Sequence, residues 1–296
     1  MTFEPLFWTV NRGSPLPGTG SSQNIGPPGT MRRAMAQLLG QDRERGTSVQ
    51  VELEVAGGVA VIRLNVPERR NALTPGMSRD LVDLLDRVDQ DPAVAALVLT
   101  GRGRAFCAGA DLSTLGEAGA DPLSDESYDG IGAIYTAFRR FGAMSVPTIA
   151  AVNGAAVGAG LNLALAADLR IVADDARLLS GFLKIGAHPG GGHLHLLDRV
   201  ASRDTIAAMA IFGEEVSGTE AVRLGLAWKA LPADQVEAEA MAMAARLADQ
   251  PDLARAVTRT LRVEVPGAVS WDAAMQIERA PQLRSFFQRS RRAGGA

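Results

Sequence analysis

Two glycine-containing stretches have residue types that can bind an oxyanion through the backbone. Residues 101–112 read Gly-Arg-Gly-Arg-Ala-Phe-Cys-Ala-Gly-Ala-Asp-Leu, and residues 153–162 read Asn-Gly-Ala-Ala-Val-Gly-Ala-Gly-Leu-Asn. Each follows an apolar run typical of a buried strand, and the second leads into a helical segment. A turn from strand to helix leaves backbone N–H groups unpaired and aimed at one point. Two such turns supply the two donors that an oxyanion hole commonly needs.

The second stretch has other interpretations. The segment 147–168 is about long enough to span a membrane, but its two asparagines and several glycines disfavour a span. Gly158-Ala159-Gly160 also begins a dinucleotide-binding fingerprint, but Leu163 stands where the third glycine belongs. A tight packing turn remains an alternative to the oxyanion site.

The two stretches, read together, resemble a known family. Ala-Phe-Cys-Ala-Gly-Ala-Asp-Leu at 105–112, followed by Ala-Val-Asn-Gly-x-x-x-Gly-x-Gly at 151–160, is similar to the crotonase superfamily of enoyl-CoA hydratases and isomerases. The resemblance spans roughly 49–284 and includes 64–73 and 217–226. Its strength lies in four separated motifs that occur in the expected order.

The resemblance implies an α/β fold. The expected core, residues 49–215, is a spiral of repeated ββα units. Residues 216–296 should form a C-terminal helical region that packs trimers, usually doubled into hexamers. The strand–helix alternation of the middle third independently fits an α/β protein.

The resemblance also implies the ligand and its site. An acyl-CoA thioester would bind with its carbonyl oxygen at the N–H groups of Ala110 and Ala159. Coenzyme A is then part of the substrate, and no separate cofactor is expected. The loop 67–72 would lie near the CoA nucleotide, where Arg69 or Arg70 could meet phosphates, or it is simply a solvated charged loop. The positions that the resemblance marks as substrate-binding are Arg70, Ala72, Ala108, Gly109, Gly158, Gly160, Phe182 and Gly190.

The chain departs from the family where the acid and base belong. Hydratases and isomerases of this kind move protons to and from carbon with carboxylic acids. Alignment on the glycine turns puts Asn162 at the first acid and Phe182 at the second. Neither side chain exchanges protons at neutral pH. Two interpretations stay open: an enzyme that works through a thioester enolate with other proton-transfer groups, and a non-catalytic acyl-CoA binding protein.

Several residues are candidates for the missing chemistry. His188 has a suitable unperturbed pKa for a general base, but it can equally be a structural histidine bonded to the backbone. Asp111 lies beside the first donor and is also a natural helix-start residue. A serine hydrolase that pairs Ser180 with His188 is a further alternative, although Ser180 lacks a nucleophile-elbow motif. An acid could also come from the segment after the first turn, at Glu117, Asp121 or Asp125.

A metal site is not expected. The three histidines lie within eight residues, but His193 and His195 are two apart in a predicted helix and would not face each other.

Composition excludes some classes of protein. The formal net charge is −3 and charged residues make up 21% of 296, so nothing indicates nucleic-acid binding. A single cysteine, Cys107, excludes an intramolecular disulfide and favours a cytoplasmic protein. Cys107 itself is interpreted as a small packed residue.

The remaining segments are assigned by pattern. Residues 1–48 are predicted to be a disordered extension, because 11–30 is rich in Gly, Pro and Ser. Gly57-Gly58 predicts a hairpin. Residues 112–129 are predicted to be a mobile loop, and 131–141 a helix. Further helices are expected over 74–88, 205–212, 217–224, 233–248, 251–261 and 271–287.

Overall fold

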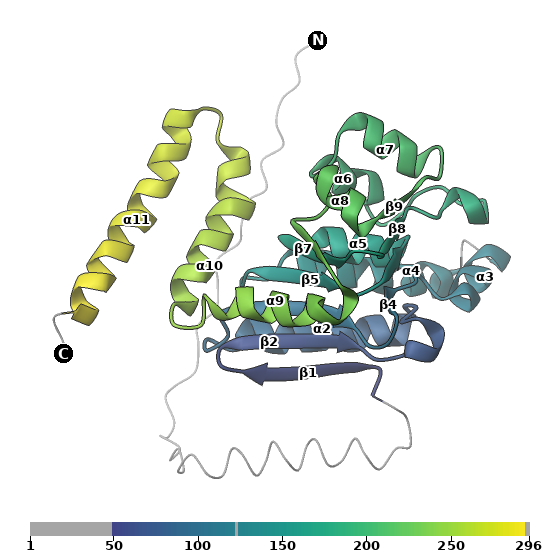
Figure 1. Ribbon diagram of the computed structural model, residues 1–296, viewed down its shortest axis with the longest axis horizontal. Coiled ribbons are helices and arrows are strands. Elements are labelled where there is room, and N and C mark those ends of the chain that lie inside the picture. Colours follow the sequence, from purple (N-terminus) through teal and green to yellow (C-terminus); the bar gives the residue numbers. More distant parts are fainter. Residues whose placement is uncertain (1–48, 122–123, 294–296) are drawn as a thin grey trace, which may run out of the picture. The chain divides into compact units, whose positions relative to one another are not determined.

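The computed structural model describes residues 49–121 and 124–293 (Figure 1). The predicted disordered extension, 1–48, lies outside the described residues. Two sheets form the core: one has the order β1-β2-β3-β5-β7-β10 and the other β4-β6-β8-β9. The β1–β2 and β8–β9 pairs are antiparallel, and the other described pairs are parallel. The strands are β1 (Val51–Ala56), β2 (Val59–Leu64), β3 (Ala96–Gly101), β4 (Ala105–Cys107), β5 (Thr148–Val152), β6 (Ala155–Val157), β7 (Leu169–Ala173), β8 (Arg177–Leu179), β9 (Glu215–Ser217) and β10 (Lys229–Leu231).

The chain repeats a strand–strand–helix unit, as predicted. In β3-β4-α3, β5-β6-α5 and β7-β8-α6, the first strand belongs to the six-stranded sheet and the second to the four-stranded sheet. Successive units therefore wind along both sheets together. The helices are α2 (Pro75–Gln90), α3 (Leu112–Ala120), α4 (Asp125–Gly142), α5 (Ala159–Ala166), α6 (His193–Asp198), α7 (Arg203–Ala210), α8 (Gly218–Arg223), α9 (Val236–Ala245), α10 (Pro251–Arg259) and α11 (Trp271–Ala293).

Burial explains why the central strands are apolar throughout. Every residue of β2, β3 and β5 is buried, which is typical of a parallel sheet covered on both faces. Helix α9 packs against β3, β5 and β7. Helix α2 packs against α4 and buries the predicted apolar face. The predicted hairpin at Gly57-Gly58 is confirmed, with Ala56 paired to Val59.

The prediction of a mobile loop over 112–129 was wrong. Helix α3 begins at Leu112, and α4 begins at Asp125, six residues before the predicted start at 131. The Ser124 hydroxyl accepts a hydrogen bond from the N–H of Ser127, and two acidic residues follow in the first turn, so α4 has a regular N-cap. Glycines in and beside this segment disfavour a helix when the sequence is considered alone. One of them, Gly130, is buried in α4 and lies close to Pro75.

The region after 216 contains the predicted helices and one strand that was not predicted. Strand β10 joins the six-stranded sheet beside β7. Arginines tie the C-terminal segments to the core: Arg255 in α10 donates to the carbonyl oxygen of Asp91, directly after α2, at 2.7 Å. Arg262, in the turn after α10, pairs with Asp168 directly before β7.

Candidate active site

The first glycine turn, residues 108–111, follows β4 and presents one backbone N–H. Leu73 lies beside this turn; its N–H donates to the carbonyl oxygen of Gly109 at 2.7 Å, and its carbonyl oxygen accepts from the N–H of Asp111 at 2.9 Å. This is a parallel bridge centred on Ala110. The bridge does not use the N–H of Ala110, and no other hydrogen bond of the described residues does. That N–H group is therefore available to a ligand.

The second glycine turn presents another N–H on the neighbouring strand. Strand β6 pairs in parallel with β4, so the two turns leave the same edge of the sheet. Ala159 is the first residue of α5, and its N–H has no partner in the described part of the chain, as expected in a first helical turn. A methyl group built on Gly109 would lie 3.7 Å from the nitrogen of Ala159. The structure thus brings the two predicted donor turns together.

The backbone conformation and the close packing of these turns require glycine at two positions. Gly158 has φ 53° and ψ −112°, a conformation that only glycine adopts readily. A side chain at Gly160 would overlap the carbonyl oxygen of Cys107, so the space beside Gly160 is filled by β4 and not left for a ligand. Cys107 is fully buried, and burial raises the pKa of its thiol to about 12, which fits its interpretation as a packed residue.

Sequence reasoning missed Asn71, which organises the loop beside the first turn. Its φ is 56°, a left-handed value that asparagine tolerates better than most residues, and its side chain is fully buried. Its Oδ1 accepts from the N–H of Val66 at 2.9 Å. Ala108 in turn donates to the carbonyl oxygen of Arg70, which places the predicted substrate-binding residues 70, 72 and 108–110 side by side. The Nδ2 of Asn71 donates to the carbonyl oxygens of Arg102, Ala105 and Phe106.

Asn162, which the sequence alignment assigns to the family's first acid, belongs to a chain of three hydrogen-bonded side chains. Asn162, one turn into α5, accepts at Oδ1 from Nδ1 of His193, with the two atoms 2.7 Å apart. The Nε2 of His193 lies 2.8 Å from Oγ of Ser180. Asn162 also donates through Nδ2 to the carbonyl oxygen of Gly190 at 3.0 Å. All three side chains of this Ser180–His193–Asn162 chain are at most 2% exposed.

These contacts settle the roles of the imidazole nitrogens. Because Asn162 uses its amide nitrogen toward Gly190, its oxygen faces Nδ1, which must carry the proton. The Nε2 lone pair then accepts from the hydroxyl of Ser180. Burial lowers the pKa of His193 from 6.5 to about 4, so the ring is neutral at physiological pH.

Aromatic rings close this part of the site. The ring of Phe182, which the sequence alignment assigns to the family's second acid, lies with its centroid 4.9 Å from that of His193. A methyl group on Gly158 would be 3.9 Å from the Phe182 ring and 3.4 Å from the carbonyl oxygen of Ser180. The hydroxyl of Tyr135, from α4, fills the space beside Gly190.

Two other predicted candidates, His188 and Asp111, form hydrogen bonds with groups close to them in the sequence. His188 is exposed, with Nδ1 2.8 Å from the carbonyl oxygen of Pro189, and it does not contact Ser180. Asp111 accepts from the hydroxyl and N–H of Ser113 in the first turn of α3, and these bonds, with Arg69 nearby, hold the pKa of its carboxyl below the usual value. A base with a lowered pKa is a weak one. The histidine that bonds to Asn162 and Ser180 is His193.

The chain is similar in sequence and fold to known proteins. A family model described as enoyl-CoA hydratase/isomerase matches residues 54–293. The chain belongs to the enoyl-CoA hydratase/isomerase family of the crotonase superfamily. The sequence resemblance is thereby confirmed.

Two relatives of this family member are named as a hydratase and an isomerase. It is 42% identical over 240 residues to a Mycobacterium tuberculosis H37Rv protein named "Probable enoyl-CoA hydratase EchA14", covering 79% of this chain and 91% of that one. It is 36% identical over 197 residues to the 1,2-epoxyphenylacetyl-CoA isomerase of Escherichia coli K12, covering 67% and 75%.

Solved structures of enoyl-CoA hydratases share the fold. The enzyme from Polaromonas sp. JS666 superimposes with a TM-score of 0.73 at 27% identity, covering 79% of this chain and 90% of that one. The enzyme from Bacillus anthracis gives a TM-score of 0.72 at 27% identity, with the same coverage.

None of the helices within 49–121 and 124–293 is long and apolar enough to cross a bilayer. The same residues contain no group of three or more His, Cys, Asp or Glu side chains placed to hold a metal ion.

Proposed function

We propose that this protein acts on an acyl-CoA thioester through an enolate whose oxygen is held by the N–H groups of Ala110 and Ala159. The observation that carries the proposal is the pair of unpaired N–H groups on adjacent turns. Negative charge grows on the thioester oxygen as the enolate forms, so donors fixed at that position lower the barrier more than they strengthen substrate binding. Hydration or isomerisation of an enoyl-CoA is the reaction class that the names of its relatives suggest.

The proposal assigns the remaining substrate contacts to the surrounding turns. Residues 70, 72 and 108–110 would line the path of the thioester beside the first donor, and Phe182 and Gly190 would border the acyl group. Coenzyme A arrives as part of the substrate, so the reaction needs no other cofactor. A cytoplasmic location is consistent with such a substrate.

A second candidate is an acyl-CoA binding protein without turnover. The observation that favours it is that Asn162 and Phe182 replace both acids of the family pattern, and that the Asn162 amide is fully engaged by His193 and Gly190. In that case the two donors would bind the thioester carbonyl and no proton would move.

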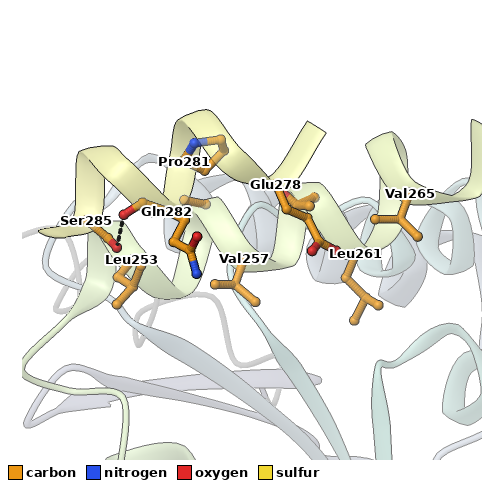
Figure 2. Close-up of a pocket in the computed structure, with 10 residues that line it drawn as sticks. Leu253, Val257, Leu261, Val265, Glu278, Pro281, Gln282 and Ser285 are labelled. Atoms are coloured by element: carbon orange, nitrogen blue, oxygen red, sulfur yellow. Dashed lines mark hydrogen bonds between the residues drawn. The ribbon is translucent and has the colours of Figure 1, made fainter. Parts of the chain in front are cut away.

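The proposed assembly is a homotrimer or a pair of trimers. Helices α10 and α11 face each other across a groove of about 420 Å³ whose lining includes Leu253, Val257, Leu261 and Pro281 (Figure 2). None of the lining residues belongs to the donor turns. Large apolar side chains are also exposed on these helices and on the turns beside α7 and α8, a pattern typical of surfaces covered by further copies of a chain.

The test removes one donor N–H and leaves the helix in place. Proline is tolerated at the first position of a helix, so Ala159→Pro deletes the N–H with little cost to α5. Hydration of crotonyl-CoA and of a longer enoyl-CoA is followed by loss of absorbance, with calorimetric binding of the same ligands. The expected loss in kcat/KM is about 100- to 1000-fold, whereas Ala159→Gly, which keeps the N–H, stays near the parent.

Three outcomes are informative. Equal activity of Ala159→Pro and the parent would contradict the oxyanion hole. Tight binding of both ligands without turnover by the parent would favour the acyl-CoA binding protein. Absence of binding would contradict both candidates.

A further inference from the structure

The Ser180–His193–Asn162 chain has the composition of an acyl-transfer centre. It contains a hydroxyl, a neutral imidazole whose free lone pair faces that hydroxyl, and an amide that fixes the ring. Acyl transfer needs these three parts and an oxyanion hole. An enolate mechanism does not account for the hydroxyl–imidazole pair.

The chain of side chains adjoins the second donor turn. Ser180 directly follows β8, and β8 pairs with β6, which directly precedes Gly158 and the donor Ala159. The N–H of Gly158 donates to the carbonyl oxygen of Leu179, the neighbour of Ser180, at 2.9 Å. Only glycine fits at 158, so no side chain at that position stands between Ser180 and the donor turn.

We propose that Ser180 is a nucleophile, that His193 is its base and that Asn162 positions the imidazole, which gives this site an acyl-CoA thioester hydrolase activity. The inference rests on the proposed function in one respect, that the thioester carbonyl binds at Ala110 and Ala159. It goes beyond that function because the bond that breaks is the carbon–sulfur bond.

The steps balance with water as the one added reactant. Oγ of Ser180 forms a bond to the thioester carbon while its proton moves to Nε2 of His193. Collapse of the tetrahedral intermediate breaks the carbon–sulfur bond, and the proton on Nε2 passes to the sulfur, which leaves as the CoA thiol. Water then attacks the serine ester by the same route, and the products are a free carboxylic acid and the original hydroxyl.

The surroundings of His193 predict the pH dependence. The side chains that contact its ring are Asn162, Ser180 and Phe182, none of which is charged. Burial lowers the pKa of the ring to about 4, so the base is ready throughout the physiological range. Hydrolysis should therefore be lost only as the pH falls toward about 4. Asn162→Asp, which adds a negative charge beside Nδ1, should move that loss to higher pH.

The experiment measures thiol release and maps the acyl group. The full chain is mixed with butyryl-CoA and with decanoyl-CoA, free CoA is detected with a thiol reagent, and samples quenched within one turnover are mapped by mass spectrometry for an acyl group on Ser180. Cys107 is fully buried, so it adds no background in the folded protein. We expect thiol release, an acyl group on Ser180, and a loss of about 100-fold or more in Ser180→Ala.

Controls separate this proposal from the proposed function. Ser78→Ala is matched, because Ser78 is also a fully buried serine, and its hydroxyl has no partner among the described residues; its thiol release should stay within about twofold of the parent. A thioether analogue of the acyl-CoA, which cannot be cleaved, reports binding by calorimetry.

Each outcome decides the proposal. Analogue binding without thiol release would overturn the hydrolase and leave the proposed function standing. No analogue binding would overturn both. Thiol release with no acyl group on Ser180, or with full activity in Ser180→Ala, would overturn the nucleophile. If Ser180→Ala does not fold, the mapping on the parent protein and His193→Gln still decide.

Discussion

The site has a backbone half and a side-chain half, and they are built in different ways. The backbone half, residues 108–111 and 158–160, presents two N–H groups that parallel strands and glycines hold in place. The side-chain half is the Ser180–His193–Asn162 chain, which joins three elements through side-chain contacts. The first half depends on what the main chain can adopt, and the second on which side chains stand at three positions.

This difference shows why one half matches the family pattern and the other departs from it. Side chains at Gly109 and Gly160 would overlap backbone of the neighbouring strand, and Gly158 has a backbone conformation that only glycine adopts readily. The side-chain half depends on matched partners: the histidine satisfies the oxygen of Asn162, and the carbonyl group of Gly190 satisfies its nitrogen. The donor turns can thus stay fixed while the chemistry that they serve changes.

The backbone half should be the less tolerant of the two. In Gly160→Ala, the added methyl group would overlap the carbonyl oxygen of Cys107, and backbone cannot move aside as a side chain can. We expect a loss of about 4 kcal/mol in the free energy of unfolding, or no folded protein. Chemical denaturation monitored by circular dichroism measures it.

The control for this change is another glycine in a helix. A methyl group on Gly116, in α3, would meet nothing within 4 Å, so Gly116→Ala should be neutral or slightly stabilising. If Gly160→Ala were as stable as Gly116→Ala, the close packing of α5 on β4 would be wrong.

The loop that supports the first donor should come next in sensitivity. Asn71→Ala removes four hydrogen bonds of a fully buried side chain and puts alanine at a positive φ. The expected loss is about 3 kcal/mol, because buried carbonyl groups lose their donors. Asn71→Asp keeps the oxygen that accepts from Val66 and loses the donors, so a denaturation series of the two variants shows which matters. Equal stability of Asn71→Ala and the parent would contradict the role assigned to this loop.

The sequence indicated the turns of the backbone half but not the contacts of His193 in the side-chain half, for a physical reason. Glycines, buried strands and helix starts are local features, so Ala110 and Ala159 could be placed before the structure was known. The histidine that bonds to Ser180 could not be identified in this way. His188 and His193 are only five residues apart, and the structure places His193 beside Ser180 and His188 at the surface. Burial of His193 under the Phe182 ring is a tertiary property without a local sequence pattern.

The same reasoning explains the errors in secondary structure. The segment 112–129 has two glycines and several acidic residues that locally favour a loop. Helices α3 and α4 form there because the N-cap of α4 and its packing on α2 outweigh these preferences. Strand β10 is three residues long, too short for a periodic pattern, and only its pairing with β7 defines it. Asn71 gave one usable signal, since an asparagine in a polar loop often adopts a positive φ.

The side-chain half should show itself in the acid stability of the protein. His193 has its pKa lowered from 6.5 to about 4 by burial, so the unfolded chain binds a proton in a range where the folded chain does not. Stability should be full above pH 6.5 and fall by about 3 kcal/mol as the pH drops to 4, slightly less than the full difference between the two pKa values implies. The measurement is the free energy of unfolding between pH 7 and 4, in the parent and in His193→Gln, where this part of the slope should disappear. His195→Gln, at an exposed histidine two residues away, is the control and should keep the slope.

The smallest expected effect concerns Asp111, which lies beside the backbone half but is not expected to do chemistry. Its carboxylate accepts from Ser113 at the start of α3, and asparagine can accept the same bonds, so Asp111→Asn should cost less than about 1 kcal/mol of stability. Because the pKa of this carboxyl is lowered, the stability that it adds is present above its unfolded pKa and is lost only as the pH falls through the lower folded value. Turnover of enoyl-CoA at pH 7 should stay within a few fold of the parent. A loss of about 100-fold with unchanged ligand binding would instead make Asp111 a base. The proton would then be transferred by a side chain of the first donor turn and not by the Ser180–His193–Asn162 chain.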